Sequence, residues 1–369
     1  MRSNSQALTR TAILLASITL YGCSNKVGIS DPVSWSTLKG WGADSHQQLV
    51  APLQQQCVKL ERKSEWAAIC QAAQGLQASD SAAVARFFRQ HFQPHRVRGE
   101  NRSDKGLITG YYEPLLQGSY VRTERFNYPL YKKPAALLKV KPEQNLLKVK
   151  DGRARGRMVN GRIAPFYSRA EIDGPLKPLA GSELLWVDNS DAAFFLHIQG
   201  SGIVQMRDGS VVGVGYADQN GHPYRAIGRD LIAMGEVEAK DMSLEAIQNW
   251  LDNNPSRAQA LKNNNPSYIF FTLREDTENG PRGSLNVPLT AERSVAVDRS
   301  IIPLGSPIWL DTQLPGAQQP YRRLVFAQDT GGAINGPVRA DLFFGRGERA
   351  KTLAGEMKQP GSLFVLLPK

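Results

Sequence analysis

Apolar positions recur at helical spacing early in the chain and later give way to short runs typical of strands. Between residues 35 and 92, Leu49, Leu53 and Leu60 share one helical face, a spacing that predicts amphipathic helices. From residue 106 to 224 the apolar runs are short and are broken by Gly, Pro and Asn. This second pattern predicts β-strands joined by turns.

After residue 224, the chain adds two helices and a second set of strands. Residues 226–234 and 243–251 have helical spacing, and Ser243 is a suitable N-cap for the second helix. Within the earlier β region, residues 194–202 are expected to form a strand. His197 is expected to be a strand residue whose hydrogen bonds are satisfied, rather than a catalyst. Later strands are expected at residues 268–272, 294–297, 307–310, 324–327 and 363–367.

The order of these elements predicts a mainly β fold with peripheral helices, in the α+β class, with one β domain inserted into another. The expected divisions are residues 1–22 as a signal peptide, 23–114 as a helical part with the first strand of the main domain, 115–265 as the inserted β domain with helices at its end, and 266–369 as the catalytic β part.

The first residues have the pattern of an export signal. Arg2 and Arg10 precede an apolar run at residues 11–21, which is too short to span a bilayer as a helix. The run ends before Cys23 in a segment that resembles a bacterial lipobox, in which the cysteine is lipidated. Ser24 follows it, where Asp would indicate retention at the inner membrane, so we expect an anchor on the periplasmic side of the outer membrane. The alternative is an ordinary signal peptide cut nearby.

The chain is basic, with a formal net charge of +11. Basic proteins favour polyanions, but an exported protein does not meet DNA, and the chain contains no nucleic-acid motif. Ten Lys and Arg residues lie between residues 132 and 162; they could hold an anionic polymer or form a solvated basic hairpin. Cys57 and Cys70 could pair in an oxidising periplasm or remain buried thiols.

Two carboxylates stand at the edges of apolar runs near the C-terminus. Asp329 and Asp341 lie twelve residues apart, with several glycines between them. A carboxylate at the end of a buried strand is partly desolvated, which raises its pKa toward values useful for proton donation. Residues 329–331 (DTG) match one half of an aspartic protease signature, but such enzymes need two copies, and too few residues follow to build a second lobe.

Other catalytic machinery has no counterpart in the sequence. The five histidines lack metal-ligand spacing, and the chain contains neither a G-x-S-x-G elbow nor a phosphate-binding loop. We therefore expect no metal and no organic cofactor. Carboxylate chemistry in a segment rich in glycine and aromatic residues is typical of enzymes that act on carbohydrates.

Several motifs in one order resemble the membrane-bound lytic murein transglycosylase A family. They are residues 109–114 (TGYYEP), 195–202 (FLHIQGSG), 265–271 (NPSYIFF), 297–305 (VDRSIIPLG) and 328–334 (QDTGGAI). The C-terminal part resembles a module named for three aspartates, here Asp298, Asp329 and Asp341. The resemblance implies a double-psi β-barrel, a smaller inserted barrel-like domain, and a sugar-binding groove between them.

The resemblance also implies a reaction on peptidoglycan glycan strands. The β-1,4 bond between N-acetylmuramic acid and N-acetylglucosamine would be cleaved to leave a 1,6-anhydromuramic end, with Asp329 as the single acid and base. Asp341 would tune or position Asp329, and Asp298 would support the fold. Candidate groove residues are Thr109, Tyr111, Tyr112, Glu113, Gln199 and Ser201. Wall-synthesis proteins are possible partners.

Two alternatives remain open from the residues themselves. An inverting hydrolase on the same barrel would use Asp329 as acid and Asp341 as base. A lipoprotein that only binds the wall would use neither carboxylate chemically.

Overall fold

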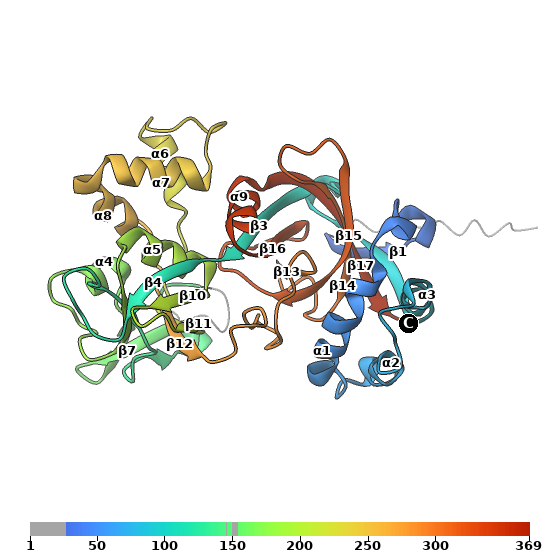
Figure 1. The fold of residues 1–369 in the computed structure, drawn as a ribbon, viewed down its shortest axis with the longest axis horizontal. Coiled ribbons are helices and arrows are strands. Elements are labelled where there is room, and N and C mark those ends of the chain that lie inside the picture. Colours follow the sequence, from blue (N-terminus) through green and yellow to red (C-terminus); the bar gives the residue numbers. More distant parts are fainter. Residues whose placement is uncertain (1–26, 145, 150–153) are drawn as a thin grey trace, which may run out of the picture.

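Two β-sheets with their own helices lie next to each other along the long axis of the molecule (Figure 1). The computed structural model describes residues 27–144, 146–149 and 154–369. Strands predominate and the fold is mixed α+β, as the hydrophobic pattern predicts. Helices α1 to α3 accompany the first sheet, and helices α4 to α8 accompany the second (Figure 1).

The first sheet contains eight strands in the order β1-β2-β17-β14-β15-β13-β16-β3. Strand β3 pairs in parallel with β16 and antiparallel with β17, so the six strands from β17 to β3 form a closed ring of paired neighbours. The strands are β1 (Gly28–Pro32), β2 (Phe92–Arg98), β3 (Gly106–Glu113), β13 (Ser294–Val297), β14 (Pro307–Gln313), β15 (Pro320–Asp329), β16 (Arg339–Arg346) and β17 (Lys358–Pro368).

The predicted N-terminal helices pack against this sheet. A buried cluster joins them to the sheet through Trp309, Phe326 and Phe364. Cys57 and Cys70 form a disulfide, which settles the alternative that the sequence left open. The helices are α1 (Val50–Leu60), α2 (Ser64–Ala73) and α3 (Ser81–His91), with 3-10 turns η1 (Trp35–Thr37), η2 (Trp41–Ala43), η3 (His46–Leu49) and η4 (Glu100–Arg102); α9 (Glu348–Glu356) follows β16.

The second sheet contains six strands in the order β12-β11-β10-β4-β9-β5. Its strands are β4 (Leu115–Ser119), β5 (Tyr128–Tyr131), β9 (Glu183–Val187), β10 (Gly202–Met206), β11 (Val211–Gln219) and β12 (Ile269–Arg274). Strand β12 pairs with β11, so the second sheet extends beyond residue 265, where the sequence places the end of the inserted part. The apolar run of β12 predicts a strand but does not reveal its partner.

The expected strand at residues 194–202 is wrong. Residues Ser190–Gln199 form helix α5, and the following strand β10 begins only at Gly202. Asn189 caps this helix by accepting hydrogen bonds from the amides of Asp191 and Ala192. A short apolar run that is buried on several sides has no periodicity that would distinguish a helix from a strand. Here the N-cap at Asn189 favours the helix.

The helices beside the second sheet include the two that the sequence predicts and others that it does not. The expected helices at residues 226–234 and 243–251 are confirmed as α6 (Ile227–Ala233) and α7 (Leu244–Asn253). Pro255 ends α7 but also begins α8 (Pro255–Asn263), because proline is well suited to the first turn of a helix. Helix α4 (Arg169–Asp173) precedes β9.

The basic segment forms a small three-stranded sheet of β6 (Leu138–Lys139), β7 (Arg155–Val159) and β8 (Arg162–Pro165), with 3-10 turn η5 (Pro142–Gln144). Strands β7 and β8 make a hairpin, as one of the two alternatives expects. Arg155 is an exception to the expected solvated hairpin, because its side chain forms a buried ion pair with Asp218 at 2.8 Å.

The export signal and Cys23 lie outside the described residues. Within the ranges that the structure describes, no helix is both long enough and apolar enough to cross a membrane.

A buried ion pair fastens the N-terminal segment to the strand ring. Arg293 donates two hydrogen bonds to the carboxylate of Asp44, at 2.8 and 2.7 Å, and each side chain is 1% exposed. The same carboxylate accepts a hydrogen bond from the amide of Leu324 in β15 at 2.9 Å. Because a buried charge is costly unless it is paired, each partner depends on the other.

We expect Asp44→Ala to lower the free energy of unfolding by about 3–5 kcal/mol, since it leaves the buried guanidinium of Arg293 without its carboxylate. Urea denaturation of the two proteins measures the loss. Asp188→Ala is a matched control, because Asp188 pairs with a largely exposed Arg125 and should lose only about 0–1 kcal/mol. Equal losses in the two variants would contradict the assignment.

Candidate active site

The two candidate carboxylates belong to one row of residues across the first sheet. Ala296 of β13 is paired in register with Asp329 of β15 on one side and with Asp341 of β16 on the other. Asp341 is in turn opposite Thr109 of β3. Residues opposite one another in a sheet project from the same face. Ala296, which has a small side chain, thus lies between the two carboxylates in this row.

Asp329 is held by donors from two other parts of the chain. The hydroxyl of Tyr111 donates to Oδ2 at 3.0 Å. The backbone amide and the hydroxyl of Ser284 both donate to Oδ1, each at 2.9 Å. The Ser284 hydroxyl also lies 2.7 Å from that of Thr330. Both carboxylate oxygens are thus oriented by fixed donors.

Ser284 was not identified from the sequence, and it lies outside the motifs, in the loop between β12 and β13. Its approach depends on Gly283, because a Cβ at that position would lie 2.5 Å from the carbonyl oxygen of Gln328. Only glycine lets this loop come so close to the end of β15. Gly283 was the one feature of the sequence that could have indicated this close approach. A lone glycine in a loop does not reveal which segment it will lie against.

Burial raises the pKa of Asp329, and the hydrogen bonds from Thr330, Ser284 and Tyr111 oppose that rise. A small apolar cluster that contains Tyr111, Ala296 and Phe343 lies next to the row and supplies the apolar surroundings. Burial is therefore the main cause of the raised pKa of Asp329, because it disfavours the charged form.

Charged and polar neighbours act on the pKa of Asp341 together with burial. Burial raises its pKa and the charge of Asp329 adds to the rise, whereas Arg339 and a hydrogen bond from the Thr109 hydroxyl lower it. Tyr224, from the segment between the second sheet and helix α6, lies within electrostatic range of Asp341, which contributes to the raised pKa of that phenol. Tyr224 was also missed from the sequence.

Asp298 lies at the end of β13 and fastens the loop that joins the two carboxylate-bearing strands. Its Oδ1 accepts hydrogen bonds from the amide and hydroxyl of Ser300, at 3.1 and 2.6 Å. Its Oδ2 accepts one from the amide of Gly336 at 2.9 Å. Gly336 has a φ of 102°, a conformation that favours glycine. These contacts are those of a structural support.

The remaining predicted groove residues divide into different roles. Thr109 and Tyr111 contact the carboxylates, whereas the ring of Tyr112 packs in the core, as alternation along a strand requires. The side chain of Glu113 has no exposed surface and pairs with Arg274 and Arg346. It is therefore a buried support and offers no surface for a sugar contact.

Gln199 and Ser201 lie where α5 gives way to β10. The side-chain oxygen of Gln199 accepts a hydrogen bond from the amide of Tyr112 at 3.0 Å, which ties α5 to β3. Ser201 is buried. Neither residue is brought against the carboxylates by a contact that the structure records.

The row provides a carboxyl group whose pKa is raised by burial, together with fixed donors that orient it. Such a group can act as a general acid and, once ionised, as a general base. Within the described part of the chain, no group of three His, Cys, Asp or Glu side chains is arranged to hold a metal ion.

Two family profiles match the chain. One is described as the MltA specific insert domain and matches residues 107–272, and the other is described as the 3D domain and matches residues 293–367. The membrane-bound lytic murein transglycosylase A of Escherichia coli (strain K12) is 35% identical over 278 residues, which are 73% of this chain and 68% of the relative. A protein of the same name from Vibrio cholerae is 31% identical over 313 residues, 83% of this chain and 74% of the relative.

Solved structures are similar over nearly the whole chain. The membrane-bound lytic murein transglycosylase from Agrobacterium tumefaciens has a TM-score of 0.82 at 30% identity, and the match covers 92% of this chain and 98% of that one. The structure of E. coli MltA with bound chitohexaose has a TM-score of 0.65 at 26% identity, covering 93% of this chain and 95% of that one.

We expect Ser284→Ala to raise the pKa of Asp329, because the lost hydroxyl stabilises the ionised carboxylate. A titration followed by carboxyl ¹³C NMR measures the change. Ser300→Ala removes an equivalent hydroxyl from Asp298 instead, and it should leave the Asp329 titration where it was. A lowered pKa in Ser284→Ala would show that the hydroxyl does not act as this donor.

Proposed function

The chain belongs to the membrane-bound lytic murein transglycosylase A family, and we propose that Asp329 is the single acid and base with which it cleaves its substrate. As a lytic murein transglycosylase it is an enzyme that cleaves peptidoglycan. The proposal for Asp329 is supported by the raised pKa of this carboxyl group and by its fixed donors. The bond to be broken is the β-1,4 link between N-acetylmuramic acid and N-acetylglucosamine.

The reaction needs one carboxyl group because the sugar supplies its own nucleophile. Protonated Asp329 donates its proton to the glycosidic oxygen as the bond to the anomeric carbon breaks. The resulting carboxylate takes the proton of the C6 hydroxyl of muramic acid, whose oxygen bonds to the anomeric carbon. No water is consumed, the product is a 1,6-anhydromuramic end, and Asp329 is protonated again. Since the cycle starts from the protonated form, the rate should fall as the pH rises through the pKa of Asp329.

The donors around Asp329 have a defined part in this cycle. Tyr111 and Ser284 donate to the carboxylate that forms after the first proton transfer, so they stabilise it without reorganisation. We assign Thr109 and Asp341 to positioning on the same row, and Asp298 to the support of the intervening loop. Asp341 is the base that an inverting hydrolase would require, and the product distinguishes that reaction from this one.

The groove for the glycan strand is proposed to lie between the two sheets. The first sheet with its helices forms a first unit, and the second sheet with its helices forms a second unit. The closed ring of six strands with two parallel pairs supports a double-psi β-barrel for the first unit. Tyr224 supports the placement of the groove, because this residue of the second unit lies within electrostatic range of Asp341 in the first. The E. coli relative solved with chitohexaose supports an oligosaccharide of β-1,4-linked N-acetylated sugars as the ligand.

We also propose that Cys23 carries a lipid and anchors the protein to the periplasmic side of the outer membrane. The lipobox-like segment before Cys23 and the membrane-bound relatives support this placement. Release of the protein from the membrane fraction by Cys23→Ala would test it; retention there would exclude a lipid on Cys23.

We expect Asp329→Asn to lower murein cleavage at least about a hundredfold, because an amide cannot donate the proton that the leaving oxygen needs. Muropeptide release from sacculi measures the rate, and mass spectrometry identifies the ends. The wild-type products should be one water lighter than the products of hydrolysis.

Asp252→Asn is a matched control, since Asp252 is exposed on α7 and its loss should leave the rate unchanged. Reducing muramic ends would instead identify a hydrolase. Equally low release by wild type and Asp329→Asn would indicate a protein that only binds the wall.

A further inference from the structure

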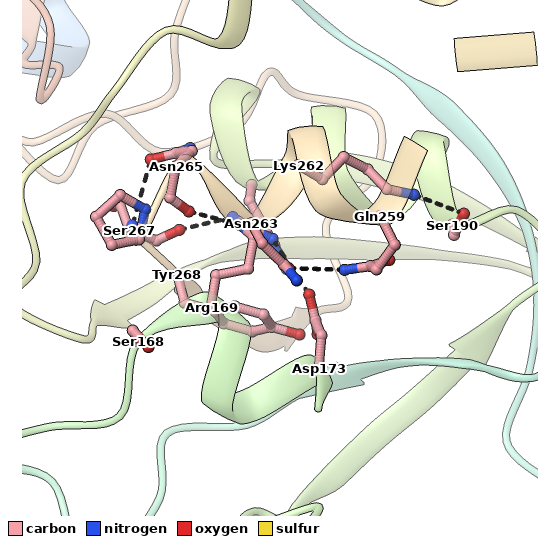
Figure 2. A network of polar contacts seen from close by, with 12 residues as sticks. Ser168, Arg169, Asp173, Ser190, Gln259, Lys262, Asn263, Asn265, Ser267 and Tyr268 are labelled. Carbon is pink, nitrogen blue, oxygen red and sulfur yellow. Dashed lines mark hydrogen bonds and ion pairs between the residues drawn. The ribbon is translucent and has the colours of Figure 1, made fainter. Parts of the chain in front are cut away.

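A cavity of about 320 Å³ lies in the second unit, lined by residues of α4, α5, α8, β5 and β9. None of its lining residues belongs to the row of carboxylates. Its volume falls in the range of small-molecule sites, which combine apolar walls with a few convergent polar groups. The buried floor includes Arg169, Lys262, His197 and Tyr268, and Figure 2 shows α4 and α8 facing each other there.

Arg169 organises the floor rather than offering free donors. It is 2% exposed and donates to the carbonyl oxygens of Asn265 and Ser267, at 3.0 and 2.6 Å. Its guanidinium also lies 4.8 and 4.9 Å from the ring centroids of Phe194 and Tyr268. A cation fixed in this way orders the surrounding side chains.

Two other side chains on the floor, those of His197 and Lys262, keep a hydrogen-bond donor that no described residue accepts. His197 accepts a hydrogen bond from Arg169 at Nδ1, at 2.9 Å, because arginine has only donors. Its proton is therefore on Nε2, which is buried and has no partner among the described residues. Lys262 is 4% exposed and donates to Ser190 at 2.8 Å and to Asp191 at 2.5 Å. An ammonium has three donors, so one remains after these two contacts.

The charges around the cavity are mixed but favour an anionic group. Four cationic side chains line it, with Arg122 and Lys177 exposed at the mouth and Arg169 and Lys262 on the floor. Among the described residues, two carboxylates line it, those of Asp173 and Glu183. Asp173 lies 3.9 Å from Arg169, and burial raises its pKa despite the neighbouring cations. Aromatic walls from Trp186, Tyr131 and Tyr268 complete the site.

We propose that this cavity binds a short zwitterionic peptide through its carboxylate, the chemistry of the stem peptides that peptidoglycan strands carry. The choice of ligand rests on the proposed function, since it is the substrate that brings such peptides to the protein. The carboxylate would meet Lys262 and His197 on the floor and Lys177 at the mouth. Asp173 and Glu183 suit the ammonium of a diamino acid residue, whereas phosphate has no cationic group to pair with them.

Isothermal titration of the full-length protein with the tripeptide L-alanyl-γ-D-glutamyl-meso-diaminopimelate tests the proposal. We expect saturable binding with a Kd at least about tenfold weaker in Arg122→Ala/Lys177→Ala, which removes only exposed side chains and should fold. Lys240→Ala is the matched control, because Lys240 is exposed in the same unit and does not line the cavity. Lys262→Met should weaken binding further, and the tripeptide amidated at its carboxylates should bind more weakly to wild type.

The tripeptide has no glycosidic bond, so Asp329→Asn should bind it as wild type does. Loss of cleavage and loss of peptide binding are therefore separable failures. Absence of binding, or equal binding by wild type and Arg122→Ala/Lys177→Ala, would overturn the proposal. So would displacement of the tripeptide by chitotetraose or by inorganic phosphate, since either would identify a different ligand for the cavity.

Discussion

The register of the first sheet is the constraint on which the active site depends. Asp329, Ala296, Asp341 and Thr109 occupy four neighbouring strands at one level, and the ring in which they lie closes through β3 and β17. A slip of one residue in any of these pairs would turn a side chain to the opposite face. The closed ring resists such a slip because each of its six strands has a partner on both sides.

Two opposing effects act on the carboxyl group of Asp329. Burial beside an apolar cluster favours the protonated form of Asp329, and the donors Tyr111 and Ser284 favour the ionised form. Neither effect alone would suit the proposed cycle, in which this group gives a proton and then takes one. The same donors hold both carboxylate oxygens, Tyr111 at Oδ2 and Ser284 at Oδ1.

The second unit is joined to the first by buried polar contacts as well as by the chain. Glu113, at the end of β3, pairs with Arg274 at the end of β12 and with Arg346 of β16. Removal of either arginine would leave that buried carboxylate less well compensated. Tyr224 lies within electrostatic range of both Asp341 and Arg169. The cavity proposed for a peptide is thereby connected, through one phenol, to the row proposed to cleave the glycan.

The sequence by itself determined the class of the fold and most of its strands and helices, and it singled out Asp329 as a candidate, because periodicity and glycine-bounded carboxylates are local signals. It did not distinguish helix from strand at residues 194–199, where burial on several sides removes periodicity. Ser284, Tyr224 and the partners of Glu113 were decided only by the tertiary structure, since they approach the row from distant segments. The same holds for the cavity around Arg169, whose floor unites α4, α5 and α8: long-range packing, not local pattern, selects which polar groups meet.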